Sequence, residues 1–169
     1  MGLNIEKSDK TLELFYENPA KAFTIREVSK LTGLPKSTLH PYLNYFKKKG
    51  LIKNNNQSSE NSLLFKIKKI NYHIEKIVTT GLLEYLIKEL NPSCIILFGS
   101  CRKGESEQES DIDIFVESYI KKDINLEKFE KLLKHKVQLF IETNINKLPS
   151  HLLNNIVNGI KLHGSFKVK

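Results

Sequence analysis

Two carboxylates follow a glycine–serine pair in the second half of this 169-residue chain. Gly99 and Ser100 come directly after the apolar run 94–98, and ten residues separate them from Asp111, which is followed by Asp113. Glycine lets a phosphate approach the backbone, and a serine hydroxyl with neighbouring amides can bond phosphate oxygens. Carboxylates two positions apart on a strand point to one face and suit hard cations such as Mg²⁺ or Mn²⁺. The pattern predicts a site for a nucleotide's phosphates and a divalent cation.

Two basic residues extend this candidate site. Arg102 and Lys103 add positive charge beside the expected phosphate position. The candidate nucleotide-binding residues are therefore Gly99, Ser100, Arg102 and Lys103, and the candidate catalytic and metal-binding residues are Asp111 and Asp113. The alternative is that both aspartates are ordinary solvated carboxylates at a strand end. Strand, turn, carboxylates and second strand occur in the order that the chemistry requires, which favours the site.

The elements around these residues predict a small α/β domain. The apolar run 94–98 lies between Pro92 and Gly99 and predicts a buried strand. Apolar residues recur at helical spacing in three further segments, so helices are expected at 71–90, 125–136 and 149–160. Two more strands are expected at 111–116 and 137–142. Such an order of elements forms a mixed sheet of three or four strands with helices packed on it.

The N-terminal segment follows a helix-turn-helix pattern. Thr24 can accept a hydrogen bond from a free amide at a helix start, and Glu27, three residues later, completes a capping box. Gly33 ends this helix in a tight turn, and the next helix stops at Gly50. Two short strands at 51–53 and 63–67 are expected to flank the polar loop 54–62 as a wing.

This segment resembles the winged helix-turn-helix domains of archaeal and bacterial transcription regulators over residues 8–70. The resemblance implies that the second helix faces duplex DNA. The candidate DNA-binding residues are Lys36, Ser37, Thr38, His40, Asn44 and Lys47. An alternative is a winged helix that docks a protein. Pro41 lies inside the second helix, so we expect a kink there or a helix that begins late.

The motif around Gly99-Ser100 and Asp111-x-Asp113 resembles the signature of the DNA polymerase β-like nucleotidyltransferases, of the minimal nucleotidyltransferase (MNT) kind. The resemblance covers residues 75–165. It implies transfer of an NMP group from an NTP, with ATP as the expected nucleotide and Mg²⁺ or Mn²⁺ as the cofactor. MNT domains of this family often act beside HEPN-domain toxins, which implies a HEPN-type or other protein acceptor. A homodimer is one alternative for the assembly.

The sequence departs from this family on the third strand, which usually carries a third catalytic carboxylate. Gln138 stands at the matching position. An amide carries no charge and is a weak base. Glu142 lies on the same strand face, but about 13 Å further along at the usual rise, so we expect no substitution by it. Two functions stay open: an active transferase, or a DNA-binding regulator whose weakened domain senses nucleotide.

Charge divides the chain in the same way as the motifs. Residues 1–70 hold 13 Lys and Arg against 6 Asp and Glu, whereas residues 71–169 hold 14 against 13. A basic half attracts nucleic acid, although a lysine-rich proteome would produce the same excess. We expect an α+β chain with a winged helix-turn-helix domain at 1–70, a helical connector at 71–92 and a nucleotidyltransferase domain at 93–169.

The remaining features are consistent with a cytoplasmic protein that has no membrane partner. No stretch approaches the roughly 18 apolar residues of a membrane helix, and the polar N-terminus lacks the apolar region of a signal peptide. Cys94 and Cys101 match no zinc spacing, and a disulfide framework is not expected. The scattered histidines are expected at surface or structural positions, namely His73, His135, His151 and His163.

Overall fold

The computed structural model describes residues 4–168. The chain forms two compact units, one up to Lys69 and one from Ile70 onward. Each unit has its own buried core, and the two are described separately below. None of the helices within the described range is long and apolar enough to cross a membrane.

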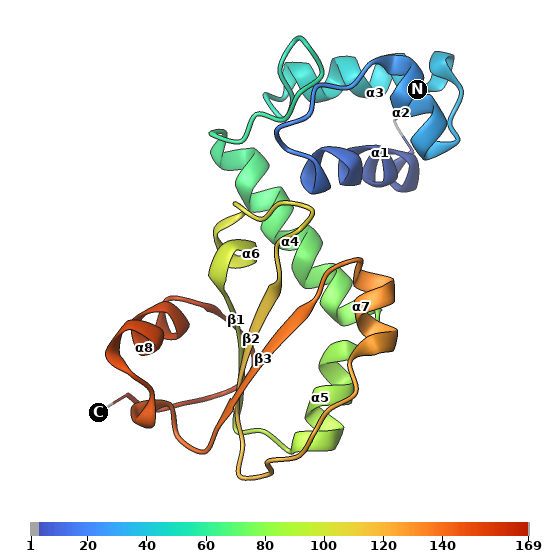
Figure 1. Ribbon diagram of the computed structural model, residues 1–169. Coiled ribbons are helices and arrows are strands. Elements are labelled where there is room, and N and C mark those ends of the chain that lie inside the picture. Colours follow the sequence, from blue (N-terminus) through green and yellow to red (C-terminus); the bar gives the residue numbers. More distant parts are fainter. Residues whose placement is uncertain (1–3, 169) are drawn as a thin grey trace. The chain divides into compact units, whose positions relative to one another are not determined.

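The N-terminal unit is built on three helices, coloured from dark blue to cyan in Figure 1: α1 (Ile5–Glu17), α2 (Ile25–Thr32) and α3 (Lys36–Lys48). The predicted capping box is confirmed, because the Thr24 side chain accepts from the Glu27 amide while the Glu27 side chain accepts from the Thr24 amide. Gly33 adopts a φ of 70° and ends α2, as its type predicts. The structure therefore confirms the helix-turn-helix.

Helix α3 runs through its proline. It begins at Lys36, so the alternative of a late start is wrong. Pro41 is the sixth residue of the helix and has no amide hydrogen to donate to the carbonyl of the exposed Ser37, four residues earlier. The opposite side of α3 is apolar and buried through Leu39, Tyr42, Leu43 and Phe46.

The wing is smaller than the sequence predicts. The strand expected at 63–67 is wrong, because helix α4 (Leu63–Thr79) begins there. The buried residues of α4 recur every four positions and lie on one helical stripe, although two of them are polar: Phe65, Lys69, His73 and Ile77. What remains of the wing is a tight turn closed by an antiparallel bridge between Ile52 and Ser58.

The C-terminal unit contains a four-stranded mixed sheet with the order β3-β2-β1-β4. Its strands are β1 (Cys94–Phe98), β2 (Ile112–Glu117), β3 (Val137–Glu142) and β4 (Ile160–Gly164). Strand β1 runs antiparallel to both β2 and β4, whereas β2 and β3 are parallel. The predicted small mixed sheet is therefore confirmed.

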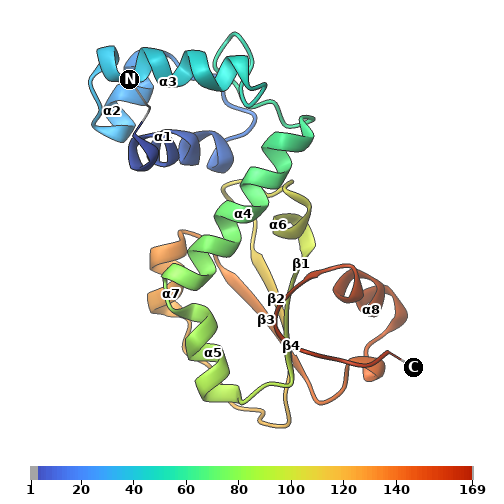
Figure 2. The same cartoon turned by 180° about the vertical axis from the view of Figure 1, so that it is seen from behind.

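Helices cover both faces of this sheet (Figures 1 and 2). Helices α5 (Leu82–Leu90) and α7 (Glu127–Leu133) pack on the face that carries Ile95, Ile114 and Leu139. Helix α8 (Ser150–Val157) packs on the other face, against Ile96, Phe98 and Phe115. Two short helices complete the unit, α6 (Gly99–Lys103) and the 3₁₀ helix η1 (Ile145–Lys147).

Two predicted helical boundaries are corrected by glycines. The segment 71–90 is not one helix, because Gly81 takes a φ of 78° between α4 and α5. The last helix ends at Val157 rather than Ile160. A Cβ on Gly159 would overlap Ile96 and lie 2.7 Å from the Leu97 carbonyl oxygen, so the chain passes directly over β1 there and continues as the edge strand β4.

Candidate functional site

The turn after β1 places Gly99 directly against a carboxylate. Phe98 and Asp113 are register partners in the β1–β2 ladder, which brings the next residue, Gly99, beside the Asp113 side chain. A Cβ on Gly99 would overlap Asp113 Oδ2 and lie 2.8 Å from Asp113 Cγ. Gly99 also has a φ of 69°, which favours glycine. Position 99 therefore admits no side chain for two independent reasons.

Gly99→Ala is expected to lower both stability and nucleotide binding. A left-handed φ costs a non-glycine residue about 1 kcal/mol, and the methyl group must in addition displace the Asp113 carboxylate. Gly81→Ala is the matched control, because Gly81 has a φ of 78° and nothing within 4 Å of its would-be Cβ. Chemical denaturation and ATP calorimetry of both variants test this. Equal losses of stability, with ATP binding unchanged in both, would contradict the close packing of Gly99.

Asp111 and Asp113 form a pair of uncompensated carboxylates. Asp113 lies in β2 and is half-buried, whereas Asp111 precedes the strand and is exposed. Burial, and next the charge of Asp111, raise the pKa of Asp113 above its usual range. Within residues 4–168 neither carboxylate forms an ion pair with a basic side chain. Two such oxygen donors fit a hard divalent cation, which would remove their repulsion.

Asp113→Asn is expected to stabilise the metal-free protein near neutral pH. With the pKa of Asp113 raised by folding, the folded chain holds this proton more tightly than the unfolded chain. The contribution of Asp113 to the free energy of unfolding is therefore most favourable below its ordinary pKa of 3.8 and falls as the pH rises through the folded-state pKa. In chelator, the melting temperature of Asp113→Asn should exceed that of wild type at about pH 7, and the gap should close toward about pH 4. A gap that does not vary with pH would contradict this expectation.

Gln138 lies beside Asp113. The parallel ladder pairs Asp113 with Gln138 and, four positions on, Glu117 with Glu142. Val137 and Leu139 belong to the core on the opposite face, so Gln138 shares the face of Asp113.

Glu142 is engaged elsewhere. Its carboxylate accepts from the Thr143 amide at 2.6 Å and pairs with Lys121 at 3.5 Å. No group of three or more His, Cys, Asp or Glu residues suited to a metal occurs among the described residues. The side-chain oxygens of the two aspartates and of Gln138 are thus the candidate cation ligands in this part of the sheet.

The predicted nucleotide residues share one pocket. Gly99, Ser100, Arg102 and Lys103 line a cavity of about 420 Å³ together with Glu105. The opposite wall comes from α8 and its C-terminal end, with Asn154, Asn155 and Asn158. Sequence reasoning missed these asparagines. Their amides supply donors and acceptors to a ligand held by the Gly-Ser turn.

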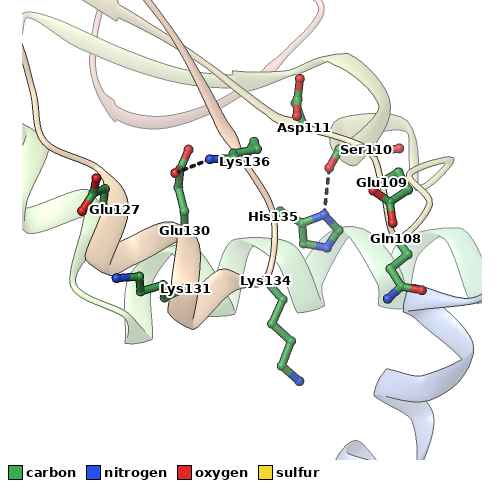
Figure 3. A pocket seen from close by; sticks show the side chains of 10 residues that line it. All are labelled: Gln108, Glu109, Ser110, Asp111, Glu127, Glu130, Lys131, Lys134, His135 and Lys136. Atoms are coloured by element: carbon green, nitrogen blue, oxygen red, sulfur yellow. Dashed lines mark hydrogen bonds and ion pairs between the residues drawn. The ribbon is translucent and has the colours of Figure 1, made fainter.

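Asp111 lines a second pocket of about 460 Å³, shown in Figure 3. The turn before β3 contributes Lys134, His135 and Lys136, and α7 contributes Glu127, Glu130 and Lys131. The loop before β2 contributes Gln108, Glu109 and Ser110. The basic and acidic side chains are mixed around this pocket. Neither aspartate is among the residues that line the cavity beside the Gly-Ser turn, and of the two only Asp111 lines the cavity at the start of β2 and β3.

The candidate DNA-binding residues all lie on α3, and most are exposed. Lys36, Ser37, His40 and Asn44 are exposed, whereas Thr38 and Lys47 are half-buried. The exposed members recur at helical spacing opposite the buried stripe of α3.

A helix-turn-helix unit followed by a mixed sheet, with Asp113 packed against Gly99 and Asp111 just before the same strand, is the arrangement of a nucleotidyltransferase-type protein with a helix-turn-helix of the DNA-binding kind. Comparison with protein families agrees. Residues 81–167 match the family model described as polymerase beta, nucleotidyltransferase, and residues 10–55 match the IclR helix-turn-helix domain. The chain belongs to the polymerase β nucleotidyltransferase family. Searches of curated proteins and of solved structures each gave no match.

Proposed function

We propose that the C-terminal unit transfers an NMP group from a nucleoside triphosphate, with ATP as the nucleotide, to a side chain of a protein partner. The observation that supports this proposal best is the packing of Asp113 on Gly99, beside Asp111. This packing places a backbone segment that a phosphate can approach close to two carboxylates that can bind a cation.

Each residue of the site has a role in this proposal. Gly99 and Ser100 would receive the phosphates, with Arg102 and Lys103 supplying positive charge from the same pocket. Asp111 and Asp113 would hold Mg²⁺ or Mn²⁺, which when bound neutralises phosphate charge. The acceptor oxygen forms a bond to the α-phosphorus while the bond to pyrophosphate breaks.

The acceptor proton needs a base. The Gln138 amide, placed beside Asp113, is a poor one. We therefore expect slow transfer unless the acceptor or its protein supplies the missing group.

Incubation with labelled ATP tests the proposal directly. The full chain is mixed with α-labelled ATP, Mg²⁺ and the product of a neighbouring gene, and label on protein is followed with time. Expected is label that depends on Mg²⁺ and on the partner. No label with any neighbouring product, despite Mg²⁺–ATP binding, would reject transfer to these proteins.

The position of Gln138 favours a second candidate function, a DNA-binding regulator that senses nucleotide without turnover. Glu142 is four register positions from Asp113 and is bonded to Thr143, so the chain offers no replacement base on this strand. The two functions differ in a measurable way. A sensor changes its affinity for DNA when Mg²⁺–ATP binds, whereas a transferase labels its acceptor.

DNA binding by the full chain is expected to be electrostatic and to depend on α3. Lys36→Ala combined with Lys47→Ala should weaken binding to duplex DNA and lower the slope of log K against log salt by about 1 for each phosphate that α3 no longer neutralises. The matched control is Lys161→Ala with Lys167→Ala, which removes the same charge from exposed positions outside the helix-turn-helix. Fluorescence anisotropy over a salt series measures both. Equal slopes in the two double variants would argue against α3 as the DNA-binding helix.

A further inference from the structure

Two buried histidines hold the loop that leads to Asp111. His73 and His135 are 1% and 5% exposed. His73 Nε2 lies 2.8 Å from Ser106 Oγ, and His135 Nδ1 lies 2.8 Å from the Ser110 carbonyl oxygen. The two rings contact each other edge to face, with centroids 5.6 Å apart. The proposed function gives neither histidine a role, although both bond the loop just before the site.

The bond from His135 acts on the residue adjacent to a proposed cation ligand. A carbonyl oxygen only accepts, so His135 Nδ1 carries the proton and donates to Ser110. Asp111 follows Ser110 and lies outside the β2 ladder. The first backbone bond after it runs from the Ile112 amide to the Lys136 carbonyl, at 2.8 Å. Neighbouring residues of one turn, 135 and 136, thus hold the backbone on both sides of Asp111.

The turn after α7 places His135 beneath the loop that precedes Asp111. Lys134 ends α7 with a φ of 63°, a conformation uncommon outside glycine, and the residue after it turns beneath the loop. In Figure 3 the His135 ring lies under the Ser110 backbone, while the Asp111 carboxylate points away from that ring. The Cys101 thiol also donates a hydrogen bond to the Asp111 carbonyl oxygen, with the two atoms 3.7 Å apart.

We infer that His135, supported by His73, is a positioning residue that sets the direction of the Asp111 carboxylate for the divalent cation. This inference rests on the proposed function, because it assigns Asp111 to that cation. His135 itself does not face the cation, since the ring and the carboxylate lie on opposite sides of the backbone. Its effect passes through the Ser110 carbonyl. Groups that hydrogen-bond directly to a metal ligand typically contribute about 10- to 100-fold to metal affinity, and we expect the lower end for His135 because it acts through the neighbouring backbone.

The test compares three variants of the full chain. His135→Asn keeps an N–H donor of similar reach, His135→Phe keeps the ring volume against His73 but removes the donor, and His135→Ala removes both. Mn²⁺ binding in the presence of ATP is followed by electron paramagnetic resonance, and ATP binding in chelator by calorimetry. His151→Ala is the control, because His151 is exposed on α8.

The expected result is a split between cation and nucleotide. His135→Phe and His135→Ala should bind Mn²⁺ about 10-fold more weakly, while their affinity for ATP in chelator stays that of wild type. His135→Asn should recover most of the Mn²⁺ affinity. Wild-type Mn²⁺ affinity in His135→Phe, or an Asn variant no better than the Phe variant, would overturn the inference.

Hydrogen exchange separates failure of this inference from failure of the proposed function. Residues 104–112 should exchange faster in His135→Phe than in wild type and His135→Asn. If wild type binds no Mn²⁺ with ATP, the proposed cation site fails, and the exchange rates still decide whether His135 holds the segment. Equal exchange in all three proteins would overturn the positioning role. His135→Phe keeps this comparison available if His135→Ala does not fold.

Discussion

Replacing either Asp111 or Asp113 with asparagine is expected to abolish Mg²⁺-dependent binding of ATP. Each change leaves size and shape nearly constant but replaces one of the two carboxylates of the candidate site with a neutral amide. Hard cations favour carboxylate oxygens, and no third carboxylate of the described sheet stands in register to take over. Calorimetry of Mg²⁺–ATP binding measures the effect, and label transfer should disappear with it.

Asp123→Asn provides the matched control for these variants. Asp123 is an exposed carboxylate in the segment between β2 and α7, so its replacement makes the same chemical change away from the pair. Its Mg²⁺–ATP affinity should equal that of wild type. Should the double variant of Asp111 and Asp113 bind Mg²⁺–ATP as wild type does, the assignment of these residues to the cation is wrong.

Gln138→Asp or Gln138→Glu is expected to accelerate transfer. The β2–β3 register places residue 138 next to Asp113, so a carboxylate introduced there joins the pair on the same face. A correctly placed general base contributes roughly 10²–10⁴-fold, and even partial restoration is measurable in single-turnover assays with labelled ATP. A third carboxylate also adds repulsion, so the variant should melt at a lower temperature in chelator and recover with Mg²⁺.

Gln138→Ala is the control, because it removes the amide without adding a base. It should transfer no faster than wild type. If Gln138→Asp binds Mg²⁺–ATP but transfers no faster than wild type with a working acceptor, the missing carboxylate is not the bottleneck. The sensor function would then need its own support, such as DNA affinity that changes with nucleotide.

Local rules are sufficient for the central parts of the site. An apolar run bounded by proline and glycine predicts strand β1, and the apolar alternation at 111–116 predicts strand β2, which begins one residue later, at Ile112. Both depend on neighbours in sequence, so no knowledge of the tertiary fold is needed. The capping box at Thr24 belongs to the same class, because its two hydrogen bonds join residues three positions apart.

The errors arise where distant contacts decide the structure. The apolar residues at 63–67 suit a strand or a buried helix equally well by periodicity. Burial of Lys69 and His73 on the same stripe as Phe65 shows that the helix prevails. Sequence patterns merge strand β4 with the preceding helix, since only its pairing with β1 and the close approach of Gly159 to Ile96 distinguish it.

The same limit applies to the walls of the site. Nothing in the spacing of Asn154, Asn155 and Asn158 connects them with Gly99, because the connection is made by α8 packing across the sheet. His135 is expected from the sequence at a surface or structural position, and its bond to Ser110 depends on the turn after α7. The motif identifies the candidate residues for the chemistry, whereas the residues that contact their surroundings, such as His135 and the three asparagines, become visible only in three dimensions.

The alignment of Asp113 with Gln138 also has a genetic consequence. Glutamine and glutamate codons differ only in their first base, so one point mutation in the gene would convert the amide beside Asp113 into a carboxylate. The strands, their register and the opposing face need no rearrangement for this step. Under the proposed function, a single-base change could therefore convert a protein that binds nucleotide without turnover into one that transfers the NMP group, or the reverse.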